Sequence, residues 1–297
     1  MFLKRCEYPG LNINELYLGT ILTVYARQLK VADYGDVFTR KYFENKRSRT
    51  LAVIKPDAYT NIGKILDIVY KNGFSINRMK MQKMTVDVAQ NFYAEHKGKD
   101  FFEGLVKFMT SDVSVALELV ADDAVKKWRD LIGPTNSLTA RTSAPNTIRA
   151  VFGTDGGKNA VHGSATSAEA IREIELLFGD TTSTTAVLNN CACMIIKPHA
   201  IQEGNAGKII DTVLEEGFEI SAFEQFNLSK PAAEEFFEVY KGVLPEFTPM
   251  VENIITGPVI ALEIRQENAV QALRDLVGPH DPEIARHLRP STIRYIY

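Results

Sequence analysis

A histidine surrounded by small residues is the side chain in this sequence best suited to covalent chemistry. His162 lies in the run Asn159-Ala160-Val161-His162-Gly163-Ser164, and Gly156 and Gly157 come shortly before it. An ordinary imidazole is largely neutral at cellular pH, so a ring nitrogen is free to attack phosphorus. The small neighbours leave room for a ligand. These residue types favour a phosphorylated histidine, and a polar surface histidine is the alternative.

Glu173 is the carboxylate best placed to support that histidine. It follows eleven residues later, in a segment that opens with Thr166-Ser167-Ala168-Glu169 and runs to Phe178. The opening fits a capping box, which predicts a helix. A carboxylate on this helix can hold the second ring nitrogen and stabilise the charge that forms there. We therefore expect His162 and Glu173 to be the catalytic residues.

Three cations recur because the sequence contains two copies of one unit. The repeated motifs lie 142 to 145 residues apart, and they are Ile54-Lys55-Pro56 with Ile196-Lys197-Pro198, Arg129–Pro134 with Arg274–Pro279, and Thr147-Ile148-Arg149 with Thr292-Ile293-Arg294. A period of this length indicates a duplicated globular domain, since solenoid periods run roughly 20 to 50 residues. Arginine binds phosphate oxygens in pairs and lysine supplies a point charge, so Lys55, Arg129 and Arg149 predict a polyphosphate site. Solvated surface charges are the alternative, which the recurrence of all three disfavours.

Composition limits the class of protein. A chain of 297 residues with 45% hydrophobic residues is long enough for two cores. A net charge of −3 offers no basic surplus for nucleic acid. Cys6, Cys191 and Cys193 are too few for a disulfide framework and indicate free thiols in a reducing compartment. No apolar run approaches the roughly 18 residues of a membrane span, and no signal-peptide core follows Met1. We expect an intracellular protein that binds neither nucleic acid nor a membrane.

The elements that must position these residues alternate between strands and helices in the first repeat. The pattern predicts strands at Thr50–Ile54, Phe74–Met84 and Val113–Leu119, and helices at Ile62–Val69, Val86–His96, Phe101–Met109, Asp123–Leu131 and Thr166–Phe178. This order predicts an α+β fold in which helices cover a sheet. We divide the chain into a β segment at 1–46, a first domain at 47–180, a linker at 181–190 and a second domain at 191–297.

The first 46 residues are too few to form a core around two strands. Strand-like runs occur at Thr20–Tyr25 and Leu29–Ala32, and Asp33–Asp36 has the composition of a turn. This segment is either an incomplete domain or an arm that packs on its neighbour.

The first repeat resembles nucleoside diphosphate kinases over its whole length. The resemblance is specific as a set, and it is carried by Ile54-Lys55-Pro56-Asp57-Ala58, Tyr93 with Phe101–Val106, Gly133-Pro134-Thr135-Asn136, Thr147-Ile148-Arg149 and Asn159–Ser164. It implies two tandem ferredoxin-like domains. It also implies ping-pong transfer of the γ-phosphate of ATP, or of another nucleoside triphosphate, to a histidine and then to a nucleoside diphosphate. Mg²⁺ would be bound through the nucleotide phosphates, with no metal ligands from the protein.

The resemblance also assigns roles to single residues. His162 would be phosphorylated and Glu173 would orient it. Phe101 would stack on the base, which predicts broad nucleotide specificity. The expected contacts to phosphates and ribose come from Lys55, Tyr93, Arg129, Thr135, Arg149 and Asn159.

Several positions depart from the family pattern. Ala165 stands where the family usually has Asp, and Ala150-Val151 stands where it usually has Gly or Ala followed by Asp. In the second repeat, Phe237 replaces Tyr93 and His280 replaces Thr135. The sequence ends at Tyr297, before the position that would match His162, so we expect no phosphorylation at that site of the second repeat.

Two tandem domains behind a strand segment narrow the resemblance to the axonemal branch of the family. Phe2–Arg5, Ala26–Leu29 and Asp33–Asp36 resemble the closing part of a DM-ten domain, and Glu283–Pro290 fits the same branch. This branch implies the cytoplasm and cytoskeleton, with the axoneme of cilia and flagella and the centrosome as locations. The implied partners are tubulin in doublet microtubules, other axonemal proteins and the γ-tubulin complex. Two hypotheses follow, an active ciliary kinase and a mainly structural microtubule inner or microtubule-nucleation protein with little or no turnover.

Overall fold

The computed structural model describes residues 16–25, 27–44, 47–179 and 184–297, together with Tyr8, Leu11 and Ile13. The DM-ten-like run Phe2–Arg5, Cys6, Ala26 and part of the predicted linker lie outside the described residues. Within the described ranges, no helix combines the length and the apolar character needed to cross a bilayer.

The first repeat is an α+β unit built on four antiparallel strands. Its elements are β3 Ser48–Ile54, η2 Pro56–Asn61, α2 Ile62–Lys71, β4 Ser75–Gln82, α3 Val86–Phe92, η3 Ala94–His96, α4 Phe102–Met109, β5 Ser114–Ala121, α5 Ala124–Ile132, α6 Ser137–Ser143, α7 Ile148–Phe152, β6 Val161–Gly163 and α8 Ser167–Phe178. The strand order β6-β3-β5-β4 is the ferredoxin-like arrangement. The predicted strands and helices are present, although the helix expected at Val86–His96 ends at Phe92 and continues as the 3-10 turn η3.

Alternating side chains explain why helices cover both faces of this sheet. Ala52 and Ile54 of β3 pack in the core that contains α2 and α5, whereas Leu51 and Val53 pack in a second core with α3, α4 and α8. Neighbouring residues of a strand point to opposite faces, so one apolar strand serves two layers. The Thr166 side chain accepts a hydrogen bond from the Glu169 backbone N–H at 3.1 Å and begins α8, as the sequence predicted.

The second repeat follows the same course over the part that the structure describes. Its elements are β7 Cys191–Ile196, α9 Pro198–Gln202, α10 Ala206–Glu215, β8 Glu219–Phe226, α11 Lys230–Phe236, η4 Glu238–Tyr240, α12 Phe247–Ile254, β9 Val259–Arg265, α13 Ala269–Val277, α14 Pro282–Leu288 and α15 Ile293–Ile296. Its strand order, β8-β9-β7, matches β4-β5-β3 of the first repeat. The repeated motifs therefore reflect repeated structure, and the chain carries two tandem ferredoxin-like units.

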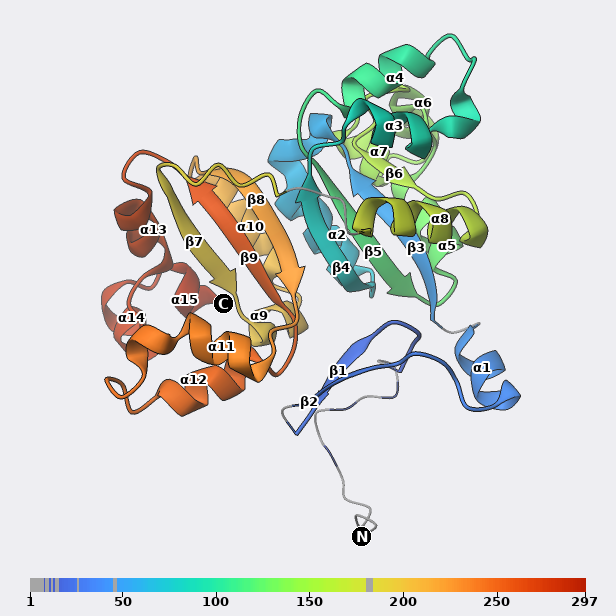
Figure 1. The fold of residues 1–297 in the computed structure, drawn as a ribbon. Helices are drawn as coiled ribbons and strands as arrows, with labels where there is room; N and C mark the ends of the chain where they lie inside the picture. The colour runs from blue at the N-terminus through green and yellow to red at the C-terminus, as the bar shows by residue number, and fades with distance from the viewer. Residues whose placement is uncertain are drawn as a thin grey trace.

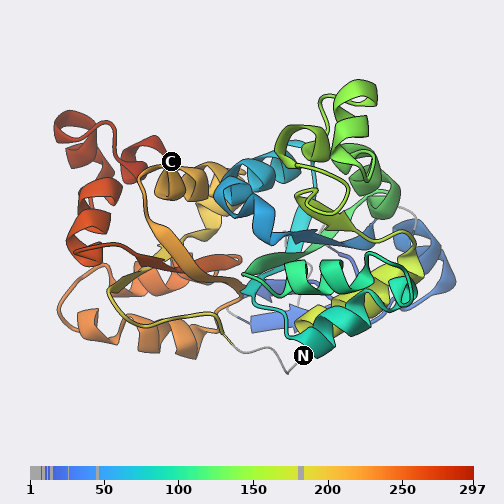
Figure 2. The same cartoon turned by 90° about the horizontal axis from the view of Figure 1, so that it is seen from above.

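The strands of the two repeats form one sheet, which Figure 2 shows from above and Figure 1 from the side. The two repeats also share one apolar core. Strand β4 pairs with β8 at Lys80 and Glu224, which joins all seven strands of the two repeats. Helices α2 and α10 pack closely at a glycine from each. A Cβ on Gly63 would lie 2.3 Å from the backbone nitrogen of Asp211 in α10. A Cβ on Gly207 would lie 2.3 Å from the backbone nitrogen of Asp67 in α2. Only glycine permits this approach of the two helix backbones.

The segment before β3 forms a hairpin and a helix. Strands β1 Ile21–Val24 and β2 Arg27–Lys30 pair antiparallel in a separate sheet. Helix α1 Val37–Glu44 follows the predicted turn at Asp33–Asp36, and the sequence had not predicted this helix. Figure 1 shows the hairpin apart from the seven-stranded sheet. The Gln28 side chain donates to the Leu228 carbonyl of the second repeat at 2.9 Å, so the hairpin contacts its neighbour.

Candidate active site

His162 lies in the middle of β6, the short edge strand that pairs with β3. It stands opposite Val53, and its ring packs edge-on against Phe92 and Tyr93, with ring centroids 4.8 and 6.1 Å away. The indole N–H of Trp128 donates to the His162 carbonyl at 3.1 Å. The backbone and one side of the ring are therefore held, while the side chain keeps 17% of its surface exposed.

Glu173 holds one nitrogen of that ring, as the sequence predicted. The Nε2 atom of His162 lies 3.1 Å from both carboxylate oxygens of Glu173, which is almost completely buried in α8. The Ser164 hydroxyl donates to the same carboxylate at 2.5 Å and accepts from the Leu51 backbone N–H at 3.3 Å. Two donors thus fix the carboxylate beneath the histidine.

This contact decides which ring nitrogen is available for reaction. An ionised carboxylate can only accept hydrogen bonds, so a neutral imidazole at this position carries its proton on Nε2. The lone pair is then on Nδ1. His162 is oriented by one nitrogen and can act as a nucleophile with the other.

Lys55 brings a buried positive charge to the site, directly after β3. Its Nζ donates to Asn159 Oδ1 at 2.7 Å and to the Gly157 carbonyl at 3.2 Å, and the residue is only 6% exposed. Burial and the neighbouring Arg149 lower the pKa of Lys55 to about 8. An anionic ligand beside this ammonium group would favour its charged form and raise the pKa again.

Arg149 is the second buried cation, and it lies in the first turn of the short helix α7. Its Nη1 donates to the Gly133 carbonyl at 2.9 Å, and its Nε and Nη2 donate to the Val161 carbonyl at 3.3 and 3.1 Å. Burial and the charge of Arg129 lower the pKa of Arg149 to about 10. The electrostatic effects of Lys55, Arg149 and Arg129 on one another indicate a local concentration of positive charge in a chain whose net charge is negative.

Polar contacts tie the remaining predicted residues to this group. The Asn159 amide donates to the Thr135 carbonyl at 2.8 Å as well as accepting from Lys55. The backbone N–H of Ala160 donates to Asp57 at 3.0 Å, and Ala160 has a φ of +67°. A left-handed alanine costs about 1 kcal/mol or more and persists where its surroundings hold it. Here it marks the turn that sends the chain into β6.

Aromatic rings line the opposite side of the site. Tyr93 is buried and stacks on His96 with centroids 6.1 Å apart, and His96 contacts Phe101 edge-on at 5.5 Å. Phe101 precedes α4 and is 54% exposed, which leaves a ring face for a ligand. The structure therefore brings the predicted residues to one region. Arg129 and Thr135 are exposed as well.

Sequence reasoning missed five residues at this site. Trp128, Phe92 and Ser164 contact His162 or its carboxylate, and Asp57 bonds Ala160. His96, which the sequence suggested only as a helix end, lies between Tyr93 and Phe101. Neither Trp128 nor Phe92 carries a sequence signal for this role, because both also read as core residues. Asp57 and Ser164 lie inside motifs that the sequence did single out, but neither was assigned a role.

The part of the chain that the structure describes offers no ligand set for a metal ion. Among the described residues, no three His, Cys, Asp or Glu side chains come together as a metal site. The buried cations instead fit the phosphates of a nucleotide, so Mg²⁺ fits here as part of the nucleotide substrate.

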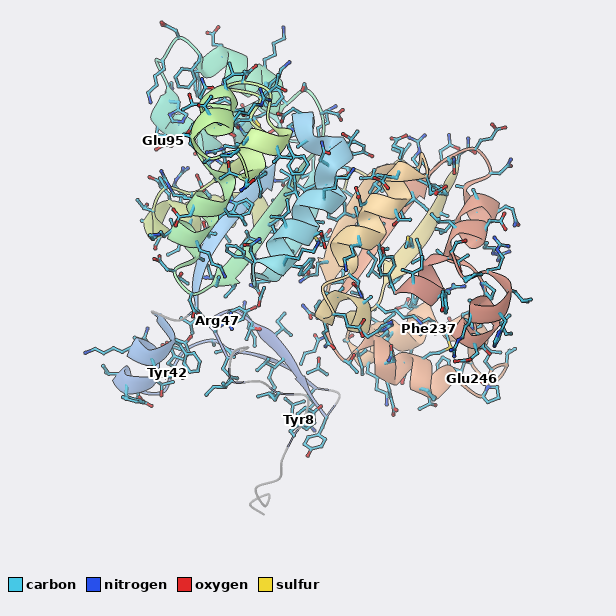
Figure 3. All side chains as sticks on the ribbon, turned by 180° about the vertical axis from the view of Figure 1, so that it is seen from behind. Tyr8, Tyr42, Arg47, Glu95, Phe237 and Glu246 are labelled. Carbon is cyan, nitrogen blue, oxygen red and sulfur yellow. The ribbon has the colours of Figure 1, made fainter. Side chains whose placement is uncertain are left out.

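The second repeat keeps the framework of the site but changes its side chains. The Arg294 guanidinium donates to the Gly278 carbonyl at 2.6 Å, which repeats the contact of Arg149 with Gly133. Phe237 stands where the first repeat has a tyrosine, as the sequence indicated. Glu246 precedes α12 at the position that Phe101 has before α4. Figure 3 labels Phe237 and Glu246 in the second repeat, far from Glu95, which neighbours His96 in the first.

Comparison with known proteins assigns both repeats to one family. The sequence profile of the family described as nucleoside diphosphate kinase matches residues 48–182 and 190–297. Nucleoside diphosphate kinase homolog 7 of Mus musculus is 45% identical over 300 residues, which cover 100% of this chain and 76% of the mouse protein. The protein of the same name from Rattus norvegicus is 45% identical over 297 residues, which are 99% of this chain and 75% of the rat protein. A nucleoside diphosphate kinase of Aquifex aeolicus is 48% identical over 132 residues, which are 44% of this chain and 93% of the bacterial protein. The chain belongs to the nucleoside diphosphate kinase family.

Proposed function

We propose that the first repeat is a nucleoside diphosphate kinase that works through a phosphohistidine at His162. The observation that carries the proposal is the contact of Nε2 with Glu173, which leaves Nδ1 as the nucleophile. The buried cations Lys55 and Arg149 supply the charge that a polyphosphate requires. Family membership supports the same reaction.

The reaction follows from these positions. The Nδ1 lone pair of His162 attacks the γ-phosphorus of a nucleoside triphosphate, and the bond from that phosphorus to the bridging oxygen breaks. The nucleoside diphosphate leaves with the electron pair of that bond. Lys55 and Arg149 stabilise the negative charge that collects on the bridging oxygen, and Glu173 stabilises the positive charge on the imidazole. The reverse attack, by the terminal phosphate oxygen of a second nucleoside diphosphate, restores the histidine.

The remaining predicted residues hold the substrate. Phe101 offers an exposed ring face to the base, and stacking is indifferent to base identity, so we expect several nucleoside triphosphates to react. Asn159, Thr135 and Arg129 would contact the ribose and the phosphates, and Tyr93 approaches them from the aromatic side. Mg²⁺ bound to the phosphates would neutralise part of their charge.

Labelling with γ-³²P-ATP tests the proposal. The protein should take up a label that is lost in acid and stable in base, as expected for a phosphohistidine, and ADP should remove it. His162→Ala should abolish the label. His199→Ala, a histidine of the second repeat, is the matched control and should label normally. A folded wild-type protein that takes up no label, or a label that survives His162→Ala, would refute the proposal.

A second, compatible function is attachment to axonemal microtubules. Exposed apolar side chains on the hairpin, Tyr25 and Leu29, support a binding role for this segment. The second repeat has lost side chains of the candidate site, which favours a role other than catalysis for that repeat. We propose domain boundaries at 1–46, 47–180, 181–190 and 191–297, with the first segment as a DM-ten-like β segment. The partners would be tubulin of the doublet, other axonemal proteins and the γ-tubulin complex, in the axoneme or at the centrosome.

Co-sedimentation with isolated axonemal doublets tests this second function. The wild-type protein and His162→Ala should pellet equally, because binding would not need the phosphohistidine. Tyr25→Ser with Leu29→Ser should reduce the pelleted fraction. Failure of the wild-type protein to pellet, or a loss of pelleting in His162→Ala alone, would contradict an attachment role that is independent of catalysis.

A further inference from the structure

A tyrosine links residues 55–59 of the first repeat, called here the phosphate-binding loop, to the sheet of the second repeat. Tyr59 lies in η2, four residues after Lys55. Its hydroxyl donates to the Ile220 carbonyl at 2.9 Å and accepts from the Ile220 N–H at 2.7 Å. Ile220 lies at the point where the register of β8 shifts against β9. One side chain of the first repeat thus makes two hydrogen bonds to the backbone of the second.

The other end of this loop reaches the candidate active site. The Lys55 N–H donates to the Ala160 carbonyl at 2.8 Å, and Asp57 accepts from the Ala160 N–H at 3.0 Å. The Ala58 N–H donates to the Lys55 carbonyl at 3.0 Å. The residues from Lys55 to Tyr59 therefore form a short, bonded path from the turn before His162 to strand β8.

The second repeat cannot make the equivalent of the Tyr59 contact to the first repeat. The second repeat has Ile201 at the position that matches Tyr59, counted from Lys197 in its own motif. Isoleucine has no hydroxyl, so it cannot form the reciprocal pair of bonds. The second repeat instead uses Gln225, whose amide donates to the carbonyls of Ile76 and of the next residue, both at 3.1 Å. Those carbonyls belong to β4 at its own register shift, away from the phosphate-binding loop.

We propose that the second repeat positions the phosphate-binding loop of the first repeat through Tyr59. Tyr59 is then a positioning residue that acts through Lys55, and the second repeat takes part in substrate binding by its partner without binding the substrate itself. The inference rests on the proposed kinase function. Loss of the two hydrogen bonds of Tyr59 lets the loop shift, and a small displacement of a phosphate ligand weakens binding measurably.

Tyr59→Phe tests the proposal, with Gln225→Met as the matched control. Each substitution removes two hydrogen bonds between the repeats and keeps a side chain of similar size, and methionine is the residue at the matching position of the first repeat, Met81. We expect Tyr59→Phe to raise the KM for the nucleoside triphosphate about fivefold to tenfold and to change kcat less than twofold. Gln225→Met should leave the KM unchanged, and both variants should unfold at similar temperatures.

Two results would overturn the inference while leaving the kinase function intact. One is a Tyr59→Phe KM equal to that of the wild type. The other is an equal rise in Gln225→Met, which would indicate general loosening between the repeats. If the wild-type protein takes up no label, the kinase proposal fails by itself. The inference is then decided by calorimetric titration with MgADP, where weaker binding in Tyr59→Phe alone supports it and equal binding in all three proteins refutes it.

Discussion

The two repeats build the same backbone frame but give it different side chains. In both, a glycine with a left-handed φ, Gly133 at +79° after α5 or Gly278 at +81° after α13, ends a helix and packs on a threonine. A Cβ on Gly133 would lie 2.3 Å from the Thr147 hydroxyl, and one on Gly278 would lie 2.2 Å from the Thr292 hydroxyl. The arginine of each repeat then bonds the carbonyl of that glycine. The frame is repeated even where the chemistry is not.

The difference lies in the groups that surround the frame. Lys55 is buried and fixed by Asn159, whereas Lys197 at the matching position is exposed. Phe237 of the second repeat lacks the hydroxyl that Tyr93 has in the first. Glu246 replaces the aromatic ring of Phe101. Retaining the fold therefore does not retain the site, because packing constrains the frame while only catalysis constrains the groups that touch the substrate.

Among the substitutions that test the difference between the repeats, loss of the Glu173 charge should slow phosphohistidine formation most. Glu173→Gln keeps the shape but removes the carboxylate that holds Nε2 of His162, and Gln can then offer an amide N–H that favours the wrong tautomer. We expect the rate of phosphohistidine formation to fall by roughly 100-fold or more. Rapid-quench labelling measures this rate.

The control for this substitution is Glu169→Gln, one turn earlier on the same helix. Glu169 accepts from the Ala165 N–H at 3.0 Å but does not contact the ring in the structure. Its substitution should leave labelling near wild type. Equal rates in Glu173→Gln and wild type would mean that the carboxylate does not orient the histidine.

Truncation of the two matched lysines should give the next largest effect. Lys55→Ala removes a buried charge beside Asn159 and should slow labelling on the order of 30-fold, since charge-assisted hydrogen bonds contribute about 1.5 to 3 kcal/mol. Lys197→Ala should leave labelling unchanged, because that lysine is exposed in the other repeat. Labelling kinetics at low ATP concentration separate the two. A comparable fall in labelling rate in both variants would show that the second repeat contributes a charge to the reaction. The two repeats would then not differ in catalytic role.

The pH dependence of nucleotide affinity should show a smaller effect of Lys55, without a substitution. Burial and Arg149 lower the pKa of Lys55 to about 8, and a bound phosphate raises it again by favouring the charged form. Affinity should be level below about pH 7. Above pH 8 it should fall by up to tenfold per pH unit, because the free protein has lost a proton that the complex needs.

Calorimetry with MgADP from pH 6.5 to 9.5 measures this slope. Lys55→Arg is the control, since arginine stays charged over the whole range and the slope should flatten. A wild-type affinity that does not change between pH 7 and 9.5 would contradict the assigned role of Lys55.

The sequence predicted most of the residues that the structure brings together at the candidate site, because the motifs of a family are the residues expected to touch the ligand. His162 and Lys55 lie in such motifs, and Glu173 lies on the helix that the capping box predicts. The stripe Ile62, Ile65, Leu66 and Val69 predicts α2 from its period alone. All four stripe residues are buried in the structure. Local signals were sufficient wherever one element determines the outcome.

Relations between distant elements were not predictable in the same way. The bond from Trp128 to His162 depends on where α5 crosses β6, and the pairing of Lys80 with Glu224 depends on two strand edges meeting. Neither edge pairing nor helix crossing changes the periodicity of a strand or helix. The Tyr59 bond to Ile220 likewise requires both repeats to be placed first.

The smallest expected effect concerns the hydroxyl that distinguishes Tyr93 from Phe237. The Tyr93 hydroxyl is buried and has no hydrogen-bond partner among the described residues, and burial raises the pKa of Tyr93 well above its ordinary value. A buried hydroxyl without a partner costs about 1 kcal/mol or more. Tyr93→Phe should therefore raise the free energy of unfolding by about 1 kcal/mol while labelling slows severalfold, because the hydroxyl would meet its partner only in the complex.

Urea unfolding and labelling of the same preparations measure the two effects. The reciprocal change, Phe237→Tyr, should lower the free energy of unfolding by about 1 kcal/mol, since it places a hydroxyl among the apolar side chains of the second repeat. It should not alter labelling. A Tyr93→Phe protein that is both less stable and fully active would show that the hydroxyl supports the fold, and the tyrosine would no longer separate a catalytic repeat from its copy.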